Sequence, residues 1–71
     1  MSMYVQSILI NKYKLNKQQA LAYVKRMGYV PIKPAHETLN YYRFRIYRPD
    51  VFNKFVTKPI NDTVTIVFGK M

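Results

Sequence analysis

The 71-residue chain contains no cysteine, only two glycines and only three acidic residues. Without cysteine, it can form neither a disulfide nor a thiolate zinc site. One histidine and three scattered acids are too few for a metal site, and two glycines leave no glycine-rich phosphate loop, so we predict no cofactor. Small domains usually need a disulfide, a metal or self-association for stability, which makes a homodimer the remaining candidate.

Catalysis and membrane insertion are also disfavoured. The single histidine, His36, has no nucleophile and orienting group from which a catalytic site could be assembled, and no carboxylate pair is credible, so we predict that the protein is not an enzyme. No apolar run approaches the roughly 18 residues of a membrane span. The first seven residues lack the features of a signal peptide. A helix lying on a membrane is unnecessary, because core burial explains the same apolar stripe.

Positive charge is the dominant feature that is present. Twelve lysines and arginines against three acids give a formal net charge of +9 at pH 7. A hydrophobic fraction of 49% nevertheless indicates a folded chain, and its length supports one small core, so residues 1–71 are predicted to form a single domain. A compact body of this charge repels itself, which is tolerated where the partner is a polyanion. Simple solubility is the alternative explanation.

The first half of the chain predicts a strand over residues 3–10 and a helix over residues 16–27. Asn16 suits the N-cap, and Gln19 completes a capping box three residues later. Gly28 suits the position after the helix, where a positive φ is common. Apolar side chains recur at helical spacing on one face of this segment. They are Ala20, Leu21, Val24 and Met27.

The second half predicts mainly strands. The strongest spans residues 39–48, and a final strand spans 63–68 with frayed residues after it. The other segments are an extended edge strand or strap at 29–34, a turn at 35–38, and an ambiguous helical turn or short strand at 51–58. The order β-α-β-β-(β)-β predicts an α+β fold in which one amphipathic helix packs on a small antiparallel sheet. The other face of the sheet should then lie in solvent.

That free face is the predicted site. Alternation along residues 39–48 puts arginine and tyrosine side chains on it, and Arg48 follows at the end of the strand. Arginine offers a bidentate fork for phosphate, and tyrosine offers a stacking ring and a hydroxyl group. Stacking for solubility alone is the competing explanation. The alternating side chains are Tyr41, Arg43, Arg45 and Tyr47.

A second basic group precedes the helix. It consists of Lys12, Lys14 and Lys17, close to a helix N-terminus whose backbone N–H groups favour an anion. A plain solvated loop is an equally good interpretation of these lysines.

The segment from Gly28 to Arg45 resembles a family of small proteins and domains encoded by large DNA viruses of amoebae, the marseillevirus group among them. The shared pattern is a Gly-aromatic helix end, a basic extended stretch, an acidic-Thr-x-Asn turn and the Tyr-Tyr-Arg-Phe-Arg strand at residues 41–45. A Phe-Val-Thr-Lys stretch at 55–58 and an apolar strand ending in glycine follow. The resemblance implies a protein of the virion or viral factory, or of the host nucleus, that acts on viral DNA or chromatin near histone-like proteins.

These observations together predict a non-catalytic protein that binds double-stranded DNA with little sequence preference by neutralising phosphates. The three acids fall at predicted turns, so the regular elements carry nearly unopposed positive charge, as expected for a polyanion partner. Three alternatives remain: a module whose basic face docks an acidic protein such as a histone surface, a structural virion protein, or a dimeric β-ribbon reading the major groove. The acids are Glu37, Asp50 and Asp62.

Overall fold

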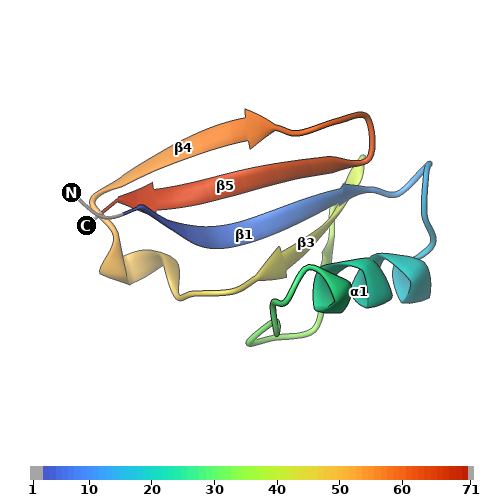
Figure 1. Cartoon of the computed structure of the whole chain (residues 1–71), viewed down its shortest axis with the longest axis horizontal. Helices are drawn as coiled ribbons and strands as arrows, with labels where there is room; N and C mark the ends of the chain where they lie inside the picture. Colours follow the sequence, from blue (N-terminus) through green and yellow to red (C-terminus); the bar gives the residue numbers. More distant parts are fainter. Residues whose placement is uncertain (1–2, 71) are drawn as a thin grey trace.

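One helix packs against a five-stranded antiparallel sheet in the computed structural model, which describes residues 3–70 (Figure 1). The strands lie in the spatial order β2-β3-β1-β5-β4. This arrangement confirms the predicted α+β architecture. The elements are β1 (Met3–Asn11), α1 (Lys17–Arg26), β2 (His36–Glu37), β3 (Tyr41–Arg45), the 3-10 helix η1 (Pro49–Val51), β4 (Lys54–Pro59) and β5 (Val64–Lys70).

The hydrophobic core is built around the central strand β1. Ile8 of β1 lies opposite Phe44 of β3 on one side and Ile66 of β5 on the other. These side chains point to the face of the sheet that α1 covers, where Ala20 and Val24 pack against them. Burial of this apolar surface is the main stabilising contribution to a domain of this size. The buried core consists of Ile8, Ile10, Ala20, Val24, Phe44, Val64 and Ile66.

The helix begins and ends as predicted. The Asn16 side chain accepts a hydrogen bond from the Gln19 N–H at 2.8 Å, and the Gln19 side chain accepts one from the Asn16 N–H at 3.0 Å. At the other end, Gly28 has a φ of +94°. The N–H of Tyr29 then donates to the Val24 carbonyl at 3.3 Å. The capping box and the glycine end therefore define α1 from local sequence alone.

Several predicted boundaries differ from the structure. Residues 36 and 37, predicted as part of a turn, form β2 because they pair with β3. The ambiguous segment 51–58 is mainly strand, because β4 begins at Lys54, and only Val51 belongs to the 3-10 helix η1. Gly69 and Lys70 were predicted to fray but pair with β1 as part of β5. The predicted fraying of Met71 lies outside the described residues.

The segment 30–35, which we call the strap, lies beside the end of β3. Its two prolines, Pro31 and Pro34, cannot donate ladder hydrogen bonds. The Ile32 N–H nevertheless donates to the Arg45 carbonyl at 2.8 Å and ties the strap to the end of β3. Of the two predicted forms, the strap is therefore the one observed.

A β-bulge at Gln6 determines which side chains of β1 face α1. The register with β5 shifts between Val5 and Ser7, so that Gln6 is an extra residue in the strand. Val5 consequently shares the α1 side of the sheet with Ile8, although the two are three residues apart. Tyr4 joins Ser7 on the opposite face, which we call the free face.

Gln6 is fully buried and hydrogen-bonds through both its backbone and its side chain. Its backbone carbonyl accepts from the N–H groups of Ile46 and Tyr47 at 2.8 and 3.2 Å. Its side-chain amide donates to the Tyr47 carbonyl at 2.8 Å and its Oε1 accepts from the Ser7 hydroxyl at 2.6 Å. Because the Gln6 carbonyl accepts from two successive N–H groups, the regular hydrogen-bond ladder between β1 and β3 is interrupted there. β3 therefore ends at Arg45, whereas the predicted strand extends to residue 48.

Aromatic side chains cover one end of the free face. The Phe52 ring lies against Gly69 of β5, in the space that a Cβ atom would occupy. Ring centroids of Tyr4, Tyr47 and Phe55 lie 6.4, 6.1 and 6.0 Å from that of Phe52. Phe52 is only 8% exposed, so the prediction of a fully wet face is wrong at this end. We call Tyr4, Tyr47, Phe52 and Phe55 the aromatic cap.

Both edges of the sheet are protected against strand pairing. One edge strand, β2, has two residues. The other, β4, contains Lys54 and Lys58 and ends at Pro59. Short, charged or proline-containing edges disfavour edge-to-edge association. The homodimer stays a prediction.

The contact between Phe52 and Gly69 is testable by a double-mutant cycle. Gly69→Ala places a methyl group inside the Phe52 ring position, and overpacking of this kind costs about 1–3 kcal/mol. In a Phe52→Ala background the clash is absent, so we expect the same substitution to cost nearly nothing. Urea unfolding of the four proteins gives the coupling energy. An equal cost of Gly69→Ala in both backgrounds would contradict the proposed packing.

Candidate nucleic-acid interface

Three of the predicted contact residues form a row on the free face of β3. Tyr41, Arg43 and Arg45 alternate with Phe44, which points into the core. Strand geometry spaces successive members by about 6.6 Å. All three are half-buried, so each presents only part of its side chain to solvent. We call Tyr41, Arg43 and Arg45 the β3 row.

The two arginines of this row open into a hollow of about 330 Å³. His36 reaches it because β2 pairs His36 directly opposite Arg43, and directly opposed residues share a face. Lys33 reaches it because the Ile32–Arg45 hydrogen bond holds the strap beside β3. No acidic side chain lines the hollow. We call the space bounded by Lys33, His36, Arg43 and Arg45 the basic hollow.

Arg43 has an unmet hydrogen-bond donor. Its Nε is buried and has no acceptor among the residues that the structure describes. A buried donor without a partner costs about 1–3 kcal/mol. An oxyanion in the basic hollow would offer this guanidinium the charge-assisted hydrogen bonds that the protein does not.

Two other predicted contact residues are paired with acids. Lys12 Nζ lies 2.7 Å from Glu37 Oε2, and Arg48 Nη2 lies 3.0 Å from Asp50 Oδ2. The Arg48 side chain is 74% exposed, and such a surface pair is weak enough for a phosphate to replace the carboxylate. Lys12 is only 22% exposed and also donates to the Thr38 carbonyl at 3.2 Å. Lys12 therefore ties the loop before α1 to the β2–β3 turn.

The remaining predicted residues lie apart from the basic hollow. Tyr47 follows the β3 row on the free face, but its ring belongs to the aromatic cap. Lys14 is exposed in the loop between β1 and α1. Lys17 lies in the first turn of α1, in the layer on the opposite side of the sheet. The structure thus separates the lysines before the helix from the arginines of β3.

Lys33 and His36 are not among the site residues predicted from the sequence. The hairpin of β2 and β3 offers a signal for His36, because a turn over residues 38–40 sets it opposite Arg43. Lys33 has no such local signal. Its position depends on a hydrogen bond between Ile32 and Arg45, which are distant in sequence.

Positive charge extends beyond the free face. Of the twelve lysines and arginines, two have an acidic partner within residues 3–70. In β4, Lys54 and Lys58 point to the α1 side of the sheet, and Lys54 lies directly opposite Lys70. Like charges at directly opposed positions are destabilising. Basic side chains therefore lie on both sides of the sheet.

Residues 3–70 contain no group of three or more histidine, aspartate or glutamate side chains placed to hold a metal ion. No helix among them has the length and apolar character needed to cross a membrane.

No family model, curated protein or solved structure matches this chain significantly. The resemblance to proteins of large DNA viruses therefore stays a prediction that depends on the motifs named above.

The Lys12–Glu37 pair predicts a specific pH dependence. Its hydrogen bond lowers the pKa of Glu37 from 4.5 and raises the pKa of Lys12 from 10.5. A lowered carboxyl pKa gives stability that is complete above about pH 4.5 and is lost as the pH falls through the folded value. We expect Glu37→Gln to lower the melting temperature at pH 7 and to leave it unchanged in strong acid.

Asp50→Asn provides a matched control, because it removes a carboxylate from the more exposed pair with Arg48. Its effect at pH 7 should be smaller than that of Glu37→Gln. Thermal unfolding followed by circular dichroism measures both. A melting-temperature difference for Glu37→Gln that is the same at pH 7 and in strong acid would refute the ion-pair contribution.

Proposed function

We propose that the protein binds double-stranded DNA with little sequence preference, through the β3 row and the basic hollow. The observation that carries this proposal is the convergence of Lys33, His36, Arg43 and Arg45 around one hollow without an acidic side chain. Arginine forks are suited to phosphate oxygens, and phosphate contacts position a protein on DNA without reading its sequence. The net charge of +9 supplies long-range attraction to the duplex.

The packing of the tyrosines favours hydrogen bonds from their hydroxyl groups to the DNA phosphate backbone over stacking of their rings on bases. Tyr47 packs edge-to-face on Tyr4, with ring centroids 5.9 Å apart and an interplanar angle of 72°. A ring held in this way is not free to stack on a base, but a phenolic hydroxyl can still bond to phosphate. Tyr41, at the other end of the β3 row, is half-buried and has the same hydroxyl chemistry.

The proposed biological setting comes from the sequence resemblance alone. The resemblance of residues 28–45 to proteins of large DNA viruses is the ground for proposing an accessory role on viral DNA or chromatin, in the virion or the viral factory. The DNA-binding proposal does not depend on this setting, because it follows from charge and from the geometry of β3.

Salt dependence is the first test. If about five lysines and arginines contact phosphates, log K should fall with log salt with a slope near −4.5. Fluorescence anisotropy with a labelled duplex, titrated over a range of salt concentrations, gives this slope. Duplexes of unrelated sequence should bind with similar affinity. Absence of binding at low salt would refute the proposal.

A matched pair of double variants locates the site. Arg43→Gln with Arg45→Gln, and Lys54→Gln with Lys58→Gln, each remove two positive charges, the first from the free face and the second from the α1 side. We expect the slope of log K against log salt to become shallower by about 1.8 for the arginine variant, and by much less for the lysine variant. Circular dichroism verifies that both remain folded. Equal losses would mean that only total charge matters and that β3 is not the site.

A further inference from the structure

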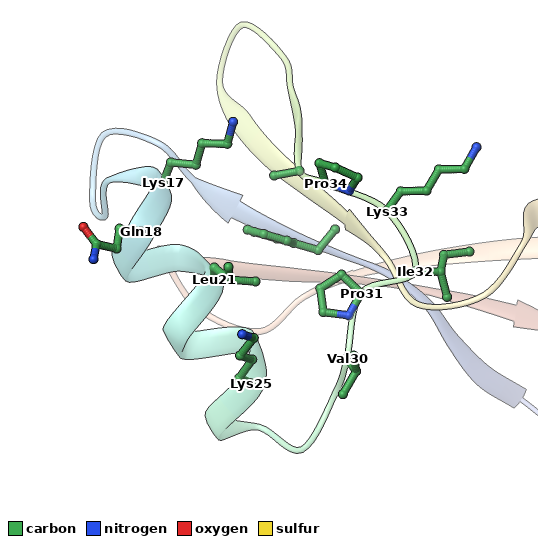
Figure 2. A pocket seen from close by; sticks show the side chains of 11 residues that line it. Lys17, Gln18, Leu21, Lys25, Val30, Pro31, Ile32, Lys33 and Pro34 are labelled. Carbon is green, nitrogen blue, oxygen red and sulfur yellow. The ribbon is translucent and has the colours of Figure 1, made fainter.

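A larger depression lies on the α1 side of the sheet, between α1 and the strap (Figure 2). We call it the strap groove. Its volume is about 740 Å³, and its lining includes Leu21 of α1, Pro31 of the strap and Phe44 of β3. In Figure 2, Leu21 and Pro31 extend towards each other across the groove. Phe44 is 1% exposed and belongs to the core, so the groove reaches down to the core itself.

Part of the apolar surface of this groove is exposed to solvent. Val30 and Ile32 of the strap are 75% and 48% exposed, and both line the groove. Single exposed apolar side chains need no explanation, but a contiguous apolar patch with a polar rim is typical of an interaction site. The patch here is continuous from the exposed strap to the buried core.

The charged side chains that line the groove are all basic, and Gln18 is the one neutral polar side chain among the lining residues. Lys17 and Lys25 lie on the α1 wall, and Lys33 lies on the strap wall (Figure 2). None of them forms an ion pair within residues 3–70. Lys17 and Lys25 are eight residues apart on one helix, which corresponds to about 12 Å along the axis. Charge complementarity therefore calls for a ligand that carries acidic groups at several separate points around an apolar centre.

This distribution discriminates between two classes of amphipathic anion. A fatty acid has one charged group at one end, and it would leave at least two of the three separated lysines without a partner. A peptide segment with several aspartates or glutamates around leucine-like side chains matches both the apolar floor and the spread of the lysines. The observations therefore favour a peptide.

The backbone of the strap indicates which conformation the peptide takes. An extended peptide binds by adding a strand, which needs free backbone donors along the groove. Pro31 and Pro34 have no N–H, and the N–H of Ile32 already donates to the Arg45 carbonyl, so among residues 31–34 only Lys33 has a backbone donor to offer. The other wall is α1, whose backbone bonds are internal. A helix satisfies its own backbone and needs only side-chain contacts, so it fits this groove better.

We propose that the strap groove binds an acidic amphipathic helix of a partner protein. Apolar side chains on one face of that helix enter between Leu21 and Pro31, and its carboxylates pair with Lys17, Lys25 and Lys33. The site lies on the opposite side of the sheet from the β3 row. The groove and the basic hollow nevertheless share Lys33, Pro34 and Ala35 of the strap, so the two sites adjoin at this segment.

The test uses a labelled synthetic peptide of about 12 residues, some three helical turns, with leucines along one face and glutamates elsewhere. Because any acidic peptide is attracted to a protein of charge +9, two control peptides are essential. One replaces the leucines with serine and keeps the charge, and the other replaces the glutamates with glutamine. We expect each control to bind at least about tenfold more weakly in anisotropy titrations.

Variants of the protein locate the binding. Val30→Asp adds a negative charge at an exposed position of the groove without touching the core, and Lys25→Glu reverses a rim charge. Each should weaken the leucine–glutamate peptide about tenfold. Lys14→Glu makes the same charge change as Lys25→Glu outside the groove and should have little effect. The double variant of Arg43 and Arg45 should still bind the peptide, which separates this proposal from DNA binding.

Several results would overturn the proposal. Equal binding of the serine control peptide would mean simple charge attraction, and undiminished binding to Val30→Asp would place the peptide elsewhere. Amide shift changes in NMR spectra on Arg43 and Arg45, instead of on Leu21 and Val30, would assign it to the free face. Binding of dodecanoate without binding of the peptide would show that the groove holds a single acyl anion.

Discussion

The bulge at Gln6 in the central strand is the constraint on which both faces of the sheet depend. Because one extra residue enters β1 there, Val5 turns towards the core and Tyr4 turns to the free face. The buried Gln6 amide then holds the backbone of Tyr47 at 2.8 Å, so that Tyr47 lies beside Tyr4. Without this extra residue the aromatic cap would lose Tyr4, and the free face would have no apolar cover at that end.

The two faces consequently differ in chemistry. On the α1 side, a conventional core extends outward into the apolar strap groove. On the free face, Phe52 over Gly69 keeps one end dry, while Arg43 and Arg45 line the basic hollow beside it. Half-burial of these arginines within the sheet restrains their side chains, which lowers the entropic cost of binding an anion.

The strap connects the two candidate sites. It is fixed to β3 by the Ile32–Arg45 hydrogen bond, and Lys33 lies between the apolar groove and the basic hollow. A ligand that moves the strap on one side would therefore displace a basic side chain on the other. The affinity for one ligand would then depend on whether the other is bound, because both sites share the strap. Each ligand would raise the affinity for the other if both favour the same position of Lys33, and would lower it if they do not.

The sequence by itself determined the features that depend on neighbouring residues. The ends of α1 at Asn16 and Gly28 and the alternation of arginine with core residues in β3 were predicted correctly, because caps and periodicity act over a few residues. The excess of positive charge follows directly from composition. Only the tertiary structure decided the bulge, the register of His36 opposite Arg43 and the position of the strap. Gln6 and Tyr47, for example, are 41 residues apart, and a hydrogen bond over that separation forms only when the whole sheet assembles.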